Sequence, residues 1–226
     1  MYKNLENINN ELQKAIQDLQ DKIVINSENL DAIYEAGKQA EYDAFWDAYQ
    51  NNGDSFNCLY AFAGQSWTDV TYNPKYPIKA IWNTQNMYAY SQITDTKVDI
   101  DISAVETNGG ATFMNAQNLK TIRKLIVPNE SATLGWASMF NGCAALENIV
   151  IEGTILGSYA TVDIHWSTKL SHDSIVGIIN ALSPNASGKT VSFSATAVNN
   201  AFEGGSTGSE WLNLIDTKSN WTITLV

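Results

Sequence analysis

Positive charge is scarce in this chain of 226 residues, which carries 13 lysines and arginines against 24 aspartates and glutamates. The formal net charge is −11 at pH 7, so the protein repels phosphate backbones and we expect no nucleic acid among its partners. Charged residues of both signs make up only 16%, whereas apolar residues make up 44%. This balance excludes a disordered tail and indicates a folded core.

Cysteines and long apolar runs are also scarce. Cys58 and Cys143 both lie in apolar and aromatic stretches, where a thiol behaves as a small hydrophobe, so two buried thiols are favoured over a disulfide. No apolar run approaches membrane-spanning length, and no membrane insertion is expected. Residues 1–6 show neither the basic nor the apolar region of a secretion signal, which predicts synthesis in a bacterial cytoplasm without a secretion route.

Catalytic motifs form the third absence. The two histidines, His165 and His172, have no further ligands at zinc-site spacing, and no Gly-x-Ser-x-Gly elbow occurs. Residues 183–190 approach a phosphate-binding P-loop, but Ser183 replaces the first glycine. The expected order there is helix, loop and strand, whereas a P-loop needs strand, loop and helix. We therefore predict no enzyme, no cofactor and no nucleotide.

Acidic residues offer little more chemistry. Asp99 and Asp101 share one face of an expected strand with Asp95 nearby, a set of oxygens that could hold Ca²⁺. No glycine-containing loop accompanies them, so a solvated face is the favoured interpretation and no metal is predicted. A polysaccharide hydrolase would need two carboxylates at a defined separation, which the linear sequence neither shows nor excludes.

Residues 1–52 carry most of the negative charge and a helical pattern of apolar residues. The pattern predicts a coiled-coil stalk that assembles a homo-oligomer, with a trimer favoured and a dimer left open. A helix folded back on its own domain is the alternative. The seam residues, spaced by three or four, are Leu5, Ile8, Leu12, Ile16, Leu19 and Ile23.

Residues 53–169 contain a repeat of about 26 residues. One set of large apolar residues recurs at intervals of 26, namely Phe62, Tyr88, Met114 and Phe140. A second set recurs at 26, 26 and 27, namely Trp67, Ile93, Leu119 and Leu146. Each unit then leads into a short apolar run. One such unit cannot bury its apolar side alone, so the period predicts a short β-solenoid of the leucine-rich-repeat type.

Residues 139–151 resemble the repeat of BspA-like leucine-rich-repeat surface proteins, with Phe140, a small residue before Cys143, then Leu146-x-x-Ile149 and a strand. Residues 34–46, 72–77 and 170–182 resemble phage and prophage tail-associated proteins of gut Firmicutes that carry such repeats. The resemblance implies a virion tail protein, and the absent export signal favours this over a bacterial cell-surface adhesin.

Residues 170–226 predict an α/β cap for the repeats. Ser171 or Asp173 can cap a helix whose apolar face comprises Ile175, Ile178, Ile179 and Leu182. A strand at 190–194, a short helix at 210–216 and a final strand at 221–226 follow. Such a cap covers the last unit and its strand edge.

Aromatic residues make up 11% of the chain and are the best candidates for a ligand surface. Flat rings stack on the apolar faces of sugars. Of the wider set, which includes Tyr90 and Trp166, four fall between the periodic positions and are the better surface candidates, although packing is the favoured interpretation for each: Trp82, Trp136, Tyr72 and Tyr76.

Together these patterns predict an α+β protein with a coiled-coil stalk, a leucine-rich-repeat-like solenoid and an α/β cap. The predicted function is non-enzymatic attachment of a phage or prophage tail to a host-cell glycan or protein. A purely structural virion component without ligand and a bacterial adhesin are the alternatives.

Overall fold

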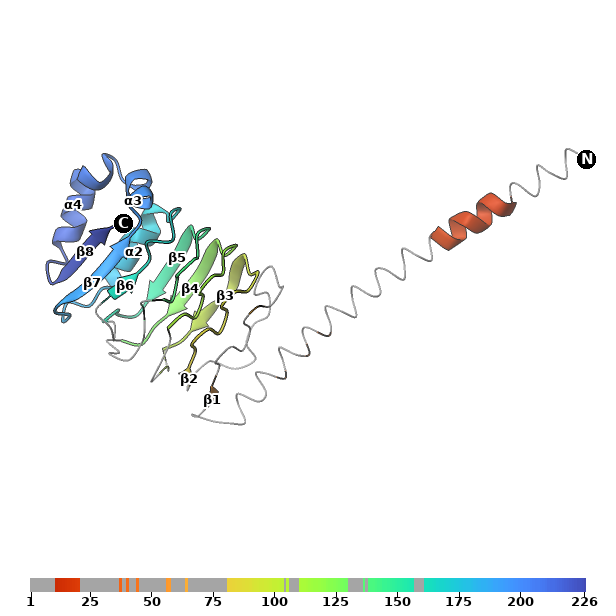
Figure 1. The fold of residues 1–226 in the computed structure, drawn as a ribbon, viewed down its shortest axis with the longest axis horizontal. Coiled ribbons are helices and arrows are strands. Elements are labelled where there is room, and N and C mark those ends of the chain that lie inside the picture. Colours follow the sequence, from red (N-terminus) through yellow and green to blue (C-terminus); the bar gives the residue numbers. More distant parts are fainter. Residues whose placement is uncertain are drawn as a thin grey trace, which may run out of the picture. The chain divides into compact units, whose positions relative to one another are not determined.

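The computed structural model describes residues 11–20, 37, 40, 44, 56–57, 64, 81–103, 105, 110–129, 136, 138–156 and 161–226. The chain divides into two compact units, Met1–Asp47 and Ala48–Val226. The described residues of the first unit are 11–20, which are helical and drawn in red in Figure 1, together with the helical residues 37, 40 and 44. The ten residues 11–20 rise about 15 Å along the helix axis.

The predicted coiled-coil stalk is wrong for the described part of the chain. Leu12, Ile16 and Leu19 line one stripe of the helix and are 57, 40 and 59% exposed. A coiled-coil stalk needs a long helix, and the described residues include no long helix of this kind. Leu5, Ile8 and Ile23 lie outside the described residues.

The described strands of the Ala48–Val226 unit form three parallel sheets. The first pairs β1 (Phe56–Asn57) with β2 (Ile81–Asn83). The second has the order β3 (Asp95–Asp101), β4 (Thr121–Ile126) and β5 (Asn148–Glu152). The third has the order β6 (Thr161–Asp163), β7 (Lys189–Phe193) and β8 (Trp221–Leu225).

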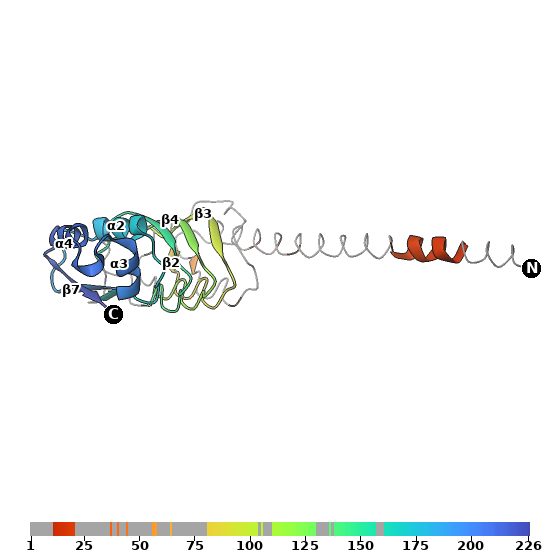
Figure 2. The same ribbon diagram turned by 90° about the horizontal axis from the view of Figure 1, so that it is seen from above.

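Helices accompany the third sheet. They are α2 (His172–Ala181), α3 (Ala195–Ala201), the 3₁₀ turn η2 (Gly205–Thr207) and α4 (Ser209–Asp216). Figure 2 shows α2, α3 and α4 gathered at the C-terminal end of this unit. The architecture is therefore a mixed α/β fold.

The 26-residue spacing sets the register of the second sheet. Asp95 of β3 pairs with Thr121 of β4, and Thr121 pairs with Asn148 of β5. Parallel strands at this spacing place equivalent side chains above one another. Three of these positions, Ile93, Leu119 and Leu146, are completely buried, as the repeat predicts.

Three aromatic rings form a ladder through the core beside this sheet. Tyr88 and Phe113 stack with centroids 5.6 Å apart and planes 5° from parallel. Phe113 and Phe140 stack at 6.0 Å and 4°. The strict interval of 26 had placed Met114 in this series, but Met114 is half-buried and its neighbour Phe113 takes the core position. The prediction was therefore one residue out of register.

The predicted solenoid is wrong because the parallel ladder does not continue past β5. Ser174 of α2 takes the place of a further strand: its hydroxyl donates to the Glu147 carbonyl at 3.2 Å and accepts from the Ile149 N–H at 3.0 Å. The next strand, β6, pairs instead with β7. Helix α2 packs against β5 and thus ends the second sheet, and the following strands form the third sheet.

Helices α2 and α4 and strands β7 and β8 lie where the sequence placed them, whereas α3 was not predicted. The Ser171 hydroxyl caps α2 by accepting from the Ser174 N–H at 3.4 Å. On the buried face of this helix, Ile175, Ile178 and Ile179 are 1% exposed or less. Within the described residues, no helix is both long and apolar enough to cross a membrane.

We predict that Phe113→Ala destabilises the protein strongly, because Phe113 is fully buried between two stacked rings. The expected loss is about 3–5 kcal/mol in the free energy of unfolding, measured by urea unfolding. Val150→Ala is the control, since Val150 is 54% exposed in β5 and its loss stays within about 0.5 kcal/mol. Equal losses for the two variants would show that the ladder is not a stabilising core.

Candidate ligand-binding surface

A stack of tight turns lies beside the strands. The Tyr90 N–H donates to the Met114 carbonyl at 2.8 Å, and the Asn115 N–H donates to the Asn141 carbonyl at 2.7 Å. In a parallel arrangement, each such bond places the donor next to the residue that follows the acceptor. Tyr90, Asn115 and Gly142 therefore occupy the same position in three successive turns.

The series extends by one turn on either side. Before Tyr90, the Gly64 N–H donates to the Ala89 carbonyl at 2.9 Å. After Gly142, the backbone N–H groups of Cys143 and Ser167 close equivalent turns on Phe140 and Ile164, and the Ser167 hydroxyl donates to the Cys143 carbonyl at 3.2 Å. Trp166, which precedes Ser167, therefore corresponds to Gly142, which precedes Cys143. We call this row of equivalent residues the turn column: Gly64, Tyr90, Asn115, Gly142 and Trp166.

Tyr90 holds an unfavourable backbone conformation in this column. Its φ is 60°, and the equivalent residues Gly64, Asn115 and Gly142 have φ of 71°, 58° and 74°. Glycine and asparagine tolerate this left-handed region, whereas other L-residues lose about 1–2 kcal/mol there. The Tyr90 side chain is 55% exposed, so full burial of the ring does not offset this cost. A strained, exposed aromatic residue is typical of a binding position.

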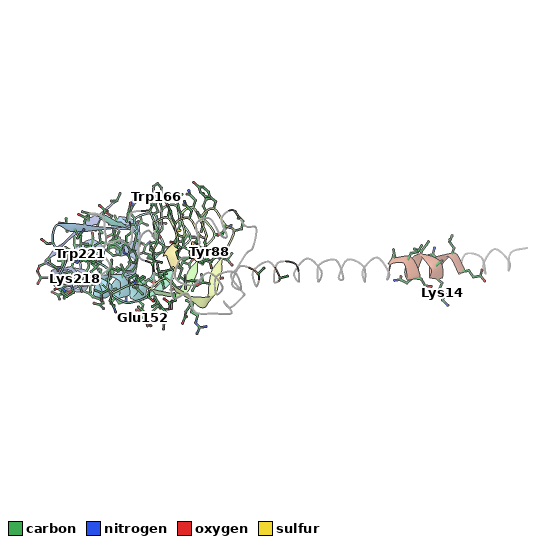
Figure 3. The ribbon with its side chains drawn as sticks, turned by 90° about the horizontal axis from the view of Figure 1, so that it is seen from below. Lys14, Tyr88, Glu152, Trp166, Lys218 and Trp221 are labelled. Atoms are coloured by element: carbon green, nitrogen blue, oxygen red, sulfur yellow. The ribbon has the colours of Figure 1, made fainter. Side chains whose placement is uncertain are left out.

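Trp166 stands at the other end of the column. It is 44% exposed, and its ring lies 4.8 Å from that of His165. Asp163 fixes His165 by accepting from its backbone N–H at 3.2 Å and by contacting ring atom Nδ1. Figure 3 shows Trp166 at the opposite edge of the unit from Glu152 of β5. The indole is thus held in place while much of its surface remains open to solvent.

Between the two aromatic residues, the turn column consists of Asn115 and Gly142. A Cβ atom at Gly142 would lie 2.1 Å from Oδ1 of Asn115, so the asparagine side chain already covers this glycine. Nearby, the Asn118 amide donates to Oε1 of Gln92 at 2.7 Å on the surface. The described surface from Tyr90 to Trp166 therefore presents rings at both ends and amide groups between them.

A hollow of about 470 Å³ lies next to Trp166, lined by Thr168, Lys169, Leu170, Ser171, His172, Asn200 and Ala201. His172 connects two helices here. Its Nε2 lies 2.7 Å from Oε1 of Glu210 in α4, and its Nδ1 lies 3.0 Å from Oδ1 of Asp173. These bonds, first to Asp173 and then to Glu210, raise the pKa of His172 above its ordinary 6.5.

Of the four predicted ligand residues, only the side chain of Trp136 is among the described residues. Trp136 is 1% exposed and packs against Phe140 with ring centroids 6.4 Å apart, so its indole is a core side chain. Tyr72 and Tyr76 lie outside the described residues, as does the side chain of Trp82 in β2. The aromatic residues found at the surface, Tyr90 and Trp166, belong to the wider set seen in the sequence. Tyr90 lies two periods of 26 before Gly142, and this alignment was the signal available for it, since a repeat unit with glycine at this position shows that nothing there is needed for the core. Trp166 lies 24 residues after Gly142, off the period, and had no such signal.

The other potentially reactive residues, Cys143, Asp99 and Asp101, form contacts within the fold. Cys143 is buried, its thiol donates to the Phe113 carbonyl at 3.0 Å, and burial raises its pKa to about 12. Asp99 lies 3.2 Å from Nε of Arg123, and Asp101 accepts from the Ser103 N–H at 2.9 Å. No group of three acidic, histidine or cysteine residues within the described part could hold a metal ion.

In the P-loop-like segment, several carbonyl groups accept hydrogen bonds from Asn220 and Trp221, and the Ser183 N–H donates to the Ile155 carbonyl at 2.8 Å. Trp221 donates from Nε1 to the Ser183 carbonyl at 2.9 Å. Asn220 donates from Nδ2 to three carbonyls of this loop, those of Ser183, Pro184 and Ala186. The order is helix α2, loop and strand β7, as the sequence indicated. This loop fastens the third sheet, and it leads into a strand, whereas a phosphate cradle leads into a helix.

Comparisons with protein-family models, with curated proteins and with solved structures find no match. The functional argument therefore rests on the geometry of the turn column and on the sequence resemblance.

We predict that the contacts of His172 stabilise the protein below pH 6.5 and that this contribution is lost as the pH rises through the raised pKa of the folded state. The side chain is 38% exposed, so solvent screening keeps the effect small. NMR titration of the His172 ring measures its pKa. Glu210→Gln is expected to lower that pKa, and Glu203→Gln is the control on the exposed surface. An unchanged pKa in Glu210→Gln would contradict the assignment.

Proposed function

We propose that this chain is a non-enzymatic attachment protein of a phage or prophage tail, and that it presents the turn column to a host-cell surface. The observation that carries the proposal is the pair of exposed aromatic residues, Tyr90 and Trp166, aligned on successive hydrogen-bonded turns. The resemblance of residues 139–151 and 170–182 to tail-associated proteins supplies the setting.

The chemistry of the column favours recognition over catalysis. Among the described residues, the groups between Tyr90 and Trp166 are amides and a glycine, which neither transfer protons readily nor act as nucleophiles near neutral pH. The nearby carboxylate of Asp163 is engaged with His165. Rigid rings flanked by amides are suited to holding a ligand in a fixed orientation.

Self-association is the second part of the proposal. Leu12, Ile16 and Leu19 present an exposed apolar stripe on the helix at residues 11–20. The same spacing continues in the sequence at Leu5, Ile8 and Ile23. A second copy of the chain carries a matching stripe, so the natural occupant is another copy, and we propose a trimer. Several columns on one particle would then bind a cell surface with avidity.

We predict that the fluorescently labelled chain binds intact Gram-positive gut bacteria of at least one strain in a panel. Trp166→Ala is expected to reduce the bound fraction at least tenfold, because it removes the more fixed of the two rings. Val150→Ala, on the exposed face of β5, should bind as the parent does. Cell binding that is equal in all three proteins would place attachment elsewhere on the chain. No binding to any strain would favour a purely structural virion component.

We predict a solution mass of three times the 24.9 kDa of one chain, measured by light scattering. Replacing Leu12, Ile16 and Leu19 together by serine should yield a monomer, because the exposed apolar stripe is lost. Replacing Glu11, Lys14 and Asp18 by serine tests the polar face of the same helix and should leave the oligomer intact. A parent protein that is monomeric would refute self-association.

A further inference from the structure

We infer that the turn column binds a neutral, linear oligosaccharide that lies across the turns from Tyr90 to Trp166. The inference rests on the proposed attachment function and names its ligand class. It assigns a terminal aromatic platform to each of the two residues and a polar subsite to Asn115.

The length of the column suits an extended ligand. Three steps separate Tyr90 from Trp166, by way of Asn115 and Gly142. Neighbouring parallel segments lie about 5 Å apart, so the two rings are roughly 15 Å from one another. The stacked rings in the core, at 5.6 and 6.0 Å, show the same step. A single sugar cannot touch both ends, whereas a short run of linked pyranose rings can.

The chemistry of the column suits sugars. One face of many pyranose rings carries C–H groups with a partial positive charge, which pack against the negative face of an aromatic ring. The ring edges carry hydroxyl groups, which both donate and accept hydrogen bonds. An asparagine amide also does both, and that of Asn115 lies over Gly142 midway along the column.

Other ligands that stack on aromatic rings fit less well. Single-stranded nucleic acid needs cationic groups along its backbone, and this chain carries a net charge of −11. A protein partner needs a contiguous apolar core, whereas amides separate these two rings. An uncharged polyhydroxylated chain is left as the ligand that uses both the rings and the amides.

The backbone strain at Tyr90 supports a binding role for its ring. The neighbouring turns have Gly64, Asn115 and Gly142 at the position equivalent to Tyr90, so the turn geometry favours a residue that tolerates positive φ. A tyrosine at this position loses stability, and its exposed ring is the feature that the substitution adds.

The test is a titration of the full chain with linear oligosaccharides of one to six units, followed by calorimetry. The probes are the β-linked glucose, N-acetylglucosamine and mannose series. In at least one series, affinity is expected to rise with length until the ligand spans the column and then to level off. Tyr90→Ala and Trp166→Ala should each weaken binding of the longer probes at least tenfold, with little effect on the shortest.

Matched variants separate the rings from the fold. Tyr90→Phe and Trp166→Phe keep a ring and should stay within about threefold of the parent. Tyr90→Gly removes both the ring and the strain, so its midpoint of urea unfolding should rise while its affinity falls at least tenfold. A variant that is more stable and yet does not bind cannot have lost binding through misfolding.

Several outcomes would overturn the inference. They are no binding of any probe, affinity that does not depend on length, and alanine variants that bind as the parent does. If whole bacteria bind the parent and both alanine variants equally, the oligosaccharide site falls while attachment stands. If no bacterium binds but an oligosaccharide does, the attachment function falls and the site stands.

Discussion

The stacking of Tyr88, Phe113 and Phe140 is the constraint on which the described Ala48–Val226 unit depends. Their planes are within 5° of parallel, and their centroids are 5.6 and 6.0 Å apart. Such close alignment requires successive turns to follow the same path, so that backbone hydrogen bonds link each turn to the next. Because the turns repeat, the residues at their outer corners also fall into line. The buried ladder thereby creates an ordered row of surface positions, and the turn column is that row.

A stack of this kind leaves open edges, and the C-terminal third of the chain closes one of them. Ser174 forms hydrogen bonds with the backbone of residues 147 and 149, to which a further strand would otherwise pair. The loop after α2 is held by donors from beyond α4: Lys218 donates from Nζ to the Leu182 carbonyl at 2.6 Å, and Trp221 donates to Ser183. Covering an edge in this way prevents pairing with another chain. Trp166 lies just before this closure, where the backbone is fixed from both sides.

The sequence was most informative where one buried position recurs at a fixed interval. It identified the core residues Ile93, Leu119 and Leu146 and the apolar face of α2, because burial demands a large apolar side chain at each such place. It did not predict where the second sheet ends, because this depends on the tertiary contacts of Ser174, which the repeat period does not reveal. It also failed at Trp136, since an aromatic residue off the period can still enter the core. Exposure and φ, which single out Tyr90, are properties of the folded chain alone.

Tyr90 shows how the same turn can serve either stability or recognition. The first four corners of the turn column have a positive φ, and three of these four carry glycine or asparagine, which satisfy that geometry without strain. Tyrosine at the fourth corner breaks a local rule that its neighbours keep. The fold tolerates the cost because Ala89 and Met114 hold the backbone on both sides, through the carbonyls that accept from Gly64 and from Tyr90 itself. A rigid core therefore allows an unfavourable corner, and the corner places a ring where solvent, and a ligand, can reach it.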